Sequence, residues 1–409
     1  MSSTFVTRNG LRVVPDLRPD PRGPADDTAT AAPPRARRVR ARDTATRTSG
    51  TTFAALFALI AVLNLLGLVM VLSASAVTAL YDYGTPWYQF LRQFLWVLVG
   101  SGALVFTLRV DYHRWRRWGR LALGASLVLL VLVLVPGLGM NVNGASRWLG
   151  WGPLSMQPSE MAKLAMVLFA ADLLARRGEK VRNWRLGLQP VMVVFGVVAA
   201  LFMLQPNLGT TAILAAVVLV MLFVAGTPTK PLAAVVVGLG TLGAIFALVE
   251  PYRFRRLMAF RDPWADPLNT GFQTVQSQTG IANGGLLGTG LGEGRAKWGF
   301  LPEAHTDFIY AIIGEELGLL GALTVVALFV GLGLLGVRTA LRAPDRYGML
   351  LATGITTWIL VQAFVNIGAV VGVLPITGVP LPFVSAGGSS LLFTMAAAGI
   401  LLNIARRTR

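Results

Sequence analysis

The chain has 409 residues, of which 54% are hydrophobic and only 13% are charged. A water-soluble fold cannot bury that much apolar surface, so the composition excludes an ordinary soluble protein. The sequence has no cysteine, which excludes disulfides and thiolate chemistry, and its two histidines exclude a multi-histidine metal centre. The net charge of +17 does not indicate nucleic-acid binding, because the basic residues lie in short clusters between apolar runs.

The first 50 residues are polar and rich in arginine and proline. Such a segment cannot bury a core, so we expect residues 1–50 to form a disordered cytoplasmic tail. The apolar run that begins near Phe53 is expected to be an uncleaved anchor, since no signal peptide precedes it. Residues 51–409 are then expected to form one polytopic membrane domain.

Ten apolar segments follow, each long enough to cross a bilayer core of about 30 Å as a helix. Because backbone in lipid must satisfy its own hydrogen bonds, the expected fold class is an all-α integral membrane bundle of about ten transmembrane helices. The approximate segments are 53–75, 89–108, 121–139, 159–175, 187–204, 210–226, 231–250, 308–337, 349–372 and 385–404.

The distribution of basic residues predicts the orientation of the bundle. If the N-terminus is inside, the cytoplasmic segments hold 27 of the 36 lysines and arginines. This positive-inside asymmetry places both termini in the cytoplasm. It also makes residues 251–307, between the seventh and eighth helices, a long extracytoplasmic loop.

The first polar constellation, NGASRWLGWGPLSMQPSEMAKLAM, runs from an outside loop into the fourth segment. Glu160 and Lys163 are three residues apart, so they can pair on one helical face. Such a pair is either an internal salt bridge or a binding site for a phosphate or a sugar. Arg147, in the same loop, is a candidate anion ligand.

The second constellation, GEGRAKWGFLPEAHTDFIYAIIGEELGLLG, enters the eighth segment. At the water boundary, Asp307 is either a helix N-cap, with Thr306 as the alternative cap, or a general base for a substrate hydroxyl. Further along, Glu315 and Glu316 lie inside the membrane and are functional candidates or members of buried pairs. Gly314 and Gly318 are expected to permit close helix packing.

Two proline-broken junctions complete the predicted outside face: LQPNLGT at 204–210 and LPITGVPLPFVSAGGSS at 374–390. Non-helical backbone at membrane depth persists only where it lines protein or a polar cavity. The GGSS run, which includes Ser389, either offers backbone N–H groups to a phosphate or permits tight helix packing.

In their order along the chain, these motifs closely resemble those of the FtsW/RodA (SEDS) family over residues 53–404. The resemblance implies a ten-helix peptidoglycan glycosyltransferase that polymerises lipid II on the outer side of the cytoplasmic membrane. The LPEAHTDFI and GEELG stretches look more like the division members than the elongation members, which implies a place at the division septum. The resemblance also implies a class B penicillin-binding transpeptidase and other divisome proteins as partners.

Carried over from the family's motifs, Asp307 falls on the proposed catalytic aspartate. The substrate-binding residues that the resemblance implies are Glu160, Lys163, Arg295, Lys297, Glu303 and His305, and the candidates from the sequence alone, Arg147 and Ser389, join them. Arg147, Lys163, Arg295 and Lys297 are the candidates for a cationic clamp on the pyrophosphate leaving group. The chain departs from the family at Asn207, where aspartate is common, and at Ala386, where tyrosine is frequent.

Two other functions fit a polytopic chain of this kind: a lipid II flippase and a noncatalytic scaffold of the division complex. A flippase would line a path across both leaflets, whereas the polar candidates here concentrate at the predicted outer end. No cofactor is implied. A divalent cation would assist the leaving group, but no sequence motif indicates a metal site.

Overall fold

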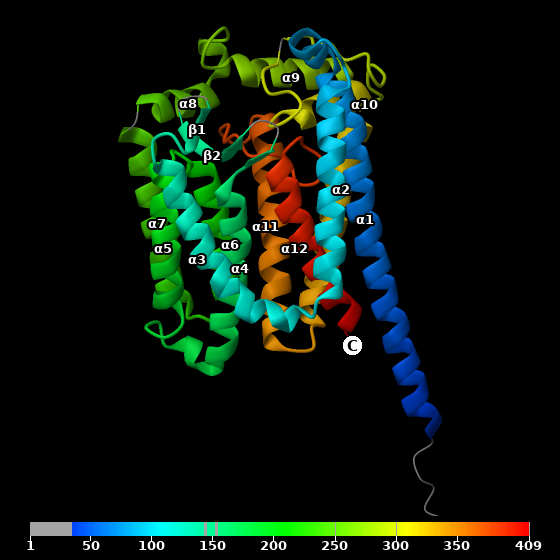
Figure 1. The fold of residues 1–409 in the computed structure, drawn as a ribbon, viewed down its shortest axis with the longest axis vertical. Helices are drawn as coiled ribbons and strands as arrows, with labels where there is room; N and C mark the ends of the chain where they lie inside the picture. Colours follow the sequence, from blue (N-terminus) through cyan, green and yellow to red (C-terminus); the bar gives the residue numbers. More distant parts are fainter. Residues whose placement is uncertain (1–34, 143–144, 152–153, 250, 300, 409) are drawn as a thin grey trace, which may run out of the picture. The chain divides into compact units, whose positions relative to one another are not determined.

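The computed structural model describes residues 35–142, 145–151, 154–249, 251–299 and 301–408. The bundle lies within one compact unit, Ala45–Arg409, and Figure 1 shows its helices running side by side. The α-helices are α1 (Arg35–Tyr83), α2 (Tyr88–Arg109), α3 (Trp115–Leu134), α4 (Pro158–Arg177), α5 (Leu188–Leu204), α6 (Leu208–Val224), α7 (Thr229–Val249), α8 (Pro251–Arg261), α9 (Phe272–Gly284), α10 (Ile309–Leu341), α11 (Arg346–Val370) and α12 (Gly388–Arg407).

Helix α1 begins at Arg35, so residues 35–50 are helical where the sequence analysis expected disorder. Alanine and arginine fill most of residues 35–42, and both have high helix propensity, which the composition of the whole segment obscures. The expectation for residues 1–34 falls outside the described residues.

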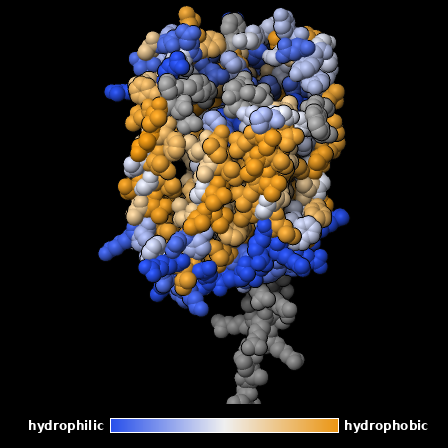
Figure 2. Space-filling view, turned by 60° about the vertical axis from the view of Figure 1, so that its left-hand side comes forward, coloured by the Kyte–Doolittle hydropathy of each residue, from blue (hydrophilic) through white to orange (hydrophobic). Residues whose placement is uncertain are grey.

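Seven helices of the described chain are long and apolar enough to cross a membrane: α1, α2, α3, α7, α10, α11 and α12. Helices α5 and α6 are equally apolar but shorter, with 17 residues each. Helix α4 coincides with the fourth predicted segment. Figure 2 shows an apolar band between two polar rims on the visible face. The all-α membrane class is confirmed, whereas the number of ten crossings stays a prediction.

A small antiparallel sheet between α3 and α4 was not predicted. Strands β1 (Gly139–Val142), β2 (Ala145–Trp151) and β3 (Leu154–Met156) pair in the order β1-β2-β3. The pairing of β1 with β2 is irregular between Met140 and Asn141. Strands β1 and β3 have only four and three residues, and β2, with seven, does not alternate between apolar and polar residues, so no strand pattern could be recognised.

The segment 251–307, which was predicted as one long loop, contains α8, the short 3-10 helix η3 (Pro263–Ala265) and α9. The rest of this segment, from 285 to the start of α10, consists of turns and extended chain in the part that the structure describes. Helix α9 packs against both α10 and α11.

Helix α11 is the central element of the bundle. It packs against α4, α6, α10 and α12, and its large residue Trp358 is fully buried. Helix α7 is the opposite case, because it contacts α6 and α8 and most of its apolar surface is exposed. In a membrane the exposed apolar surface of α7 would face lipid. The well-packed part of the bundle is the part around α11.

Contacts between distant segments identify the two ends of the bundle. At one end, His113 pairs with Asp345 at 2.9 Å, Arg407 pairs with Asp111 at 2.7 Å, and Arg346 donates to the carbonyl of Gly178 at 3.2 Å. We call this the basic end, because it carries the arginine-rich segments after α2 and α4 and the two arginines in the last turn of α12. The opposite end, which we call the Asp307 end, carries the sheet, α8 and α9 (Figure 1).

Helix α10 is interrupted at Gly318, whose φ of 68° is non-helical. The chain after α9 docks against this interruption through its backbone. Thr289 N–H donates to the carbonyl of Glu315 at 2.9 Å, and Leu319 N–H donates to that of Gly285 at 2.9 Å. We call this contact the α10 clasp. The sequence analysis expected Gly318 to permit close helix packing, whereas the structure has a break in α10 at which a non-helical segment docks. The clasp satisfies the backbone groups that the interruption frees.

We expect Gly318→Ala to destabilise the protein. The added Cβ would lie 2.3 Å from the backbone nitrogen of Gly288, and alanine disfavours a φ of 68°. The combined cost is about 2–4 kcal/mol, measurable as a lower midpoint of thermal unfolding in detergent. The control is Gly124→Ala on α3, because nothing lies within 4 Å of its added Cβ. Equal midpoints for the two variants would contradict the clasp.

Candidate active site

Asp307 lies in the turn that precedes α10, and its side chain is partly exposed. The helix N-cap is Phe308, which makes no side-chain capping bond, so neither Asp307 nor Thr306 occupies the cap position. The Asp307 carboxylate faces Gly378, since a Cβ built on that glycine would lie 3.4 Å from Asp307 Oδ2. The carboxylate therefore borders the non-helical segment between α11 and α12.

That segment, residues 371–387, is fixed to the Asp307 turn by main-chain contacts. Ala386 N–H donates to the carbonyl of His305 at 2.9 Å. The amide of Asn366, on α11, donates to the carbonyls of Asp307 at 2.7 Å and of Val379 at 2.8 Å. One side chain thus sets the distance between the catalytic candidate and the segment in front of it.

Glu160 and Lys163 form the internal salt bridge that their spacing allowed, with 2.9 Å between Nζ and Oε1. Both side chains are buried. Lys163 also donates to Gln362 Oε1 at 2.7 Å, and Gln362 Nε2 donates to the carbonyl of Pro380 at 3.0 Å. The pair on α4 is therefore connected through α11 to the same non-helical segment.

The two membrane-depth carboxylates of α10 both have partners. Glu315 accepts hydrogen bonds from the backbone N–H groups of Arg295, at 2.9 Å, and Ala296, at 3.1 Å. Glu316 pairs with Lys297 at 2.8 Å and accepts a hydrogen bond from Ser73 of α1 at 2.7 Å. Lys297 is buried in this cluster, whereas the Arg295 side chain is exposed.

Arg147, on β2, binds the first proline-broken junction. Its Nε donates to the carbonyl of Gln205 at 2.9 Å, and one terminal nitrogen donates to that of Pro206 at 2.7 Å. Asn207 is the N-cap of α6 and accepts a hydrogen bond from Thr210 N–H at 3.3 Å. Because an amide oxygen performs this capping as a carboxylate would, the departure at position 207 preserves the local structure.

Ser389 is fully buried at the start of α12 and accepts a hydrogen bond from the backbone N–H of Gln157 at 3.1 Å. It therefore joins the starts of α12 and α4. This contact agrees with the second expectation for the GGSS run, that it permits tight helix packing.

His305 and Glu303 precede Asp307 in the same turn region. Burial lowers the pKa of His305; Glu303 opposes this, and the nearby Arg92 adds to it, so the pKa lies below its usual value. The imidazole is accordingly neutral at pH 7. Glu303 is exposed, with a φ of 58°, and accepts a hydrogen bond from Thr306 at 2.8 Å.

The site residues that the sequence analysis missed are Gln362 and Asn366. The two amides are four residues apart in an apolar segment, a spacing that places both on one face of α11. Polar side chains in a membrane helix commonly face other helices, and this was the available signal. Within the described residues, no group of three or more histidines, aspartates or glutamates is arranged to hold a metal ion.

We expect Lys163→Met to destabilise the protein by about 3–5 kcal/mol, because it leaves Glu160 as a buried, unpaired charge. The double variant Glu160→Gln with Lys163→Met removes both charges and should recover a large part of that loss. Thermal unfolding of the single and double variants in detergent measures the difference. If the double variant is as unstable as the lysine variant, the buried charge is not the cause.

Comparison with known proteins places the whole membrane region in one family. Residues 53–409 match the family FTSW_RODA_SPOVE, described as cell cycle protein. The probable peptidoglycan glycosyltransferase FtsW of Geobacter metallireducens is 44% identical over 349 residues, which are 85% of this chain and 92% of that protein. The stage V sporulation protein E of Bacillus subtilis is 43% identical, over 84% of this chain and 94% of that protein.

Solved structures agree with the sequence relatives. A chain from a study of polymerization and crosslinking by a peptidoglycan synthase complex superposes with a TM-score of 0.72 at 31% identity, covering 86% of this chain and 96% of that chain. The rod shape determining protein RodA of Thermus thermophilus superposes with a TM-score of 0.64 at 29% identity, covering 86% and 96% of the two chains. This chain therefore belongs to the FtsW/RodA/SpoVE family of cell cycle proteins.

Proposed function

We propose that this protein is a peptidoglycan glycosyltransferase that polymerises lipid II at the outer face of the cytoplasmic membrane, during septal cell division. The names of its relatives support the activity, and the relatives named FtsW support the division role. The observation that carries the mechanism is the position of the Asp307 carboxylate. It is partly exposed just before α10 and borders the non-helical segment 371–387, which is hydrogen-bonded to α11.

In the proposed reaction, Asp307 accepts the proton of a sugar hydroxyl on one lipid-linked substrate. The resulting oxygen nucleophile attacks the anomeric carbon of the growing chain, and the bond from that carbon to the pyrophosphate oxygen breaks. Undecaprenyl pyrophosphate departs with the bonding electrons. A hydroxyl is a weak nucleophile, so a positioned base contributes about 10²–10⁴-fold to the rate.

Cationic side chains are proposed to stabilise the departing pyrophosphate. Arg295 suits this role best, because its guanidinium is exposed and, among the described residues, has no ion-pair partner. Arg147 lies at the same end with two of its nitrogens bound to carbonyls. Lys163 and Lys297 are enclosed in ion pairs, so their contribution in this arrangement is to hold the site's segments in place.

Glu303, His305 and Ser389 complete the proposed substrate-binding set. Glu303 is exposed beside the Asp307 turn, and neutral His305 provides a hydrogen-bonding group without a charge. Ser389 is fully buried, and its hydrogen bond with the Gln157 N–H connects the start of α12 to that of α4. Glu315 is bound by the Arg295 N–H and Glu316 by the Lys297 ammonium, so both carboxylates have structural roles. This favours the enzyme over a flippase, in which such carboxylates would line the transport path across the membrane.

A class B penicillin-binding transpeptidase is the proposed partner, because glycan polymerisation and crosslinking are coupled in the complex to which this fold is similar. Other divisome proteins are proposed to join it at the septum. The proposed orientation places both termini in the cytoplasm, which puts the basic end inside and the Asp307 end outside.

We expect Asp307→Asn to reduce the polymerisation of purified lipid II by at least about 100-fold, because the amide cannot accept the proton. The assay is glycan formation by the full chain, with and without its transpeptidase partner. Thermal unfolding and membrane insertion should match the unchanged protein.

The matched control is Asp82→Asn, an identical substitution at an exposed position after the apolar part of α1. It should polymerise normally. Undiminished activity in the Asp307 variant would reject the base assignment, and absence of polymerisation by the unchanged chain together with its partner would reject the enzyme.

A further inference from the structure

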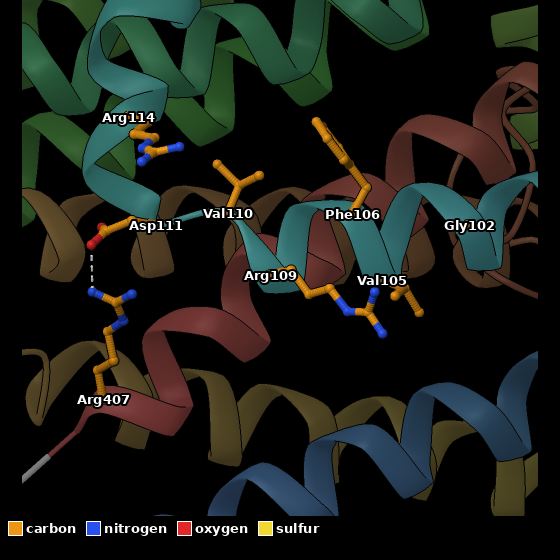
Figure 3. A pocket seen from close by; sticks show the side chains of 8 residues that line it. All are labelled: Gly102, Val105, Phe106, Arg109, Val110, Asp111, Arg114 and Arg407. Atoms are coloured by element: carbon orange, nitrogen blue, oxygen red, sulfur yellow. Dashed lines mark hydrogen bonds and ion pairs between the residues drawn. The ribbon is translucent and has the colours of Figure 1, made fainter.

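The basic end of the bundle, remote from Asp307, contains a cavity. A cavity of about 560 Å³ opens there beside the last two turns of α2 (Figure 3). Gly102, Val105 and Phe106 line one part of it, and Arg109, Arg114 and Arg407 line the other. Nothing in the proposed glycosyl transfer uses these residues.

The apolar part follows one face of a membrane helix. Gly102, Val105, Phe106 and Arg109 have the spacing i, i+3, i+4 and i+7, and the wall from 102 to 109 is about 10 Å long. Val105 is 39% exposed and Phe106 is 54% exposed. Nothing lies within 4 Å of a Cβ built on Gly102, so the far end of the wall is open. The wall therefore faces the hydrocarbon layer.

The basic part carries charge in excess of its local partners. Burial raises the pKa of Asp111, but hydrogen bonds from the His113 backbone and from the Arg407 and His113 side chains outweigh this effect. The pKa of Asp111 therefore lies below its usual value, and the carboxylate stays ionised. It pairs with Arg407 at 2.7 Å. Among the described residues, neither Arg109 nor Arg114 has an ion-pair partner. Two positive charges are left at the mouth of the cavity.

Two simpler explanations account for part of this arrangement. Arg109 lies in the last turn of α2, where a cation interacts favourably with the helix dipole. The positive-inside rule explains arginines at this end of the bundle. Neither explains an open apolar wall that ends beside two guanidinium groups which, in the described part of the chain, form no ion pair. A water-soluble acidic peptide would leave that wall unused, because the wall lies at bilayer depth.

We propose that this cavity binds one anionic phospholipid of the adjacent leaflet. The phosphate lies between Arg109 and Arg114, and an acyl chain lies against Gly102, Val105 and Phe106. Guanidinium groups recognise phosphate by paired N–H donors, and in a headgroup without its own ammonium the negative charge of the phosphate is not already neutralised within the lipid.

The first test compares two lipids with identical acyl chains, phosphatidylglycerol and phosphatidylcholine, bound to the full chain in detergent and counted by native mass spectrometry. We expect phosphatidylglycerol to bind about tenfold more tightly. The double variant Arg109→Gln with Arg114→Gln should lose this preference. The matched control, Arg185→Gln with Arg342→Gln, removes two exposed arginines from the same end and should retain it.

The second test addresses the acyl chain without changing any charge. Gly102→Leu fills the open end of the wall and should weaken phosphatidylglycerol binding about as much as the arginine variant does. Gly124→Leu, at an equally open glycine of α3, should leave binding unchanged. Thermal unfolding of the same variants verifies that each is folded.

Three results would overturn the proposal. One is equal binding of the two lipids, and another is an equal loss of preference in the arginine control. The third is competition by inorganic phosphate at a concentration similar to that of phosphatidylglycerol, combined with unchanged lipid binding in Gly102→Leu. That combination would show that the site binds free phosphate. Each of these results leaves the glycosyltransferase proposal unaffected, because binding is measured without lipid II.

Discussion

Two amide side chains of α11 hold the region around Asp307 together. Gln362 and Asn366 donate hydrogen bonds to the carbonyls of Pro380, Val379 and Asp307, at 2.7–3.0 Å. Non-helical backbone inside a membrane protein is tolerated only where other protein groups satisfy it. The helix that provides these donors is also the most extensively packed in the bundle. The turn that carries the carboxylate is therefore attached by hydrogen bonds to a helix packed at the centre of the bundle.

Buried charge serves the same purpose on both sides of this region. Lys163 neutralises Glu160 and orients the amide of Gln362, while Lys297 neutralises Glu316 beneath the α10 clasp. Both lysines resemble ligands in the sequence, but their ammonium groups are already used by the fold. The exposed Arg295 is attached to the same clasp through its backbone N–H, which Glu315 accepts. The buried lysines thus neutralise carboxylates within the fold, whereas the exposed Arg295 is available to a ligand.

Much of this arrangement could be predicted from the chain. Apolar runs located the helices, and the spacing of Glu160 and Lys163 allowed the salt bridge that forms. The pairing of Lys297 with Glu316 and with Ser73 of α1 was not predictable, because it depends on how the chain after α9 returns to α10. The sheet between α3 and α4 was missed because two of its strands are short and the third, β2, lacks the alternation of apolar and polar residues. The amides of α11 were overlooked, although polar residues four apart in an apolar helix were a readable signal.

The α10 clasp joins two segments by their main chains, so it restricts the path of residues 285–290 and leaves most of their side chains unrestricted. Leu286 and Leu287 illustrate this, since they are 68% and 79% exposed. The glycines at 284 and 288 are the opposite case, because backbone atoms lie within 2.1 Å of any Cβ built there. Sequence variation in this stretch should consequently concentrate at the leucines and spare the glycines, a pattern of mutational tolerance set by main-chain geometry alone.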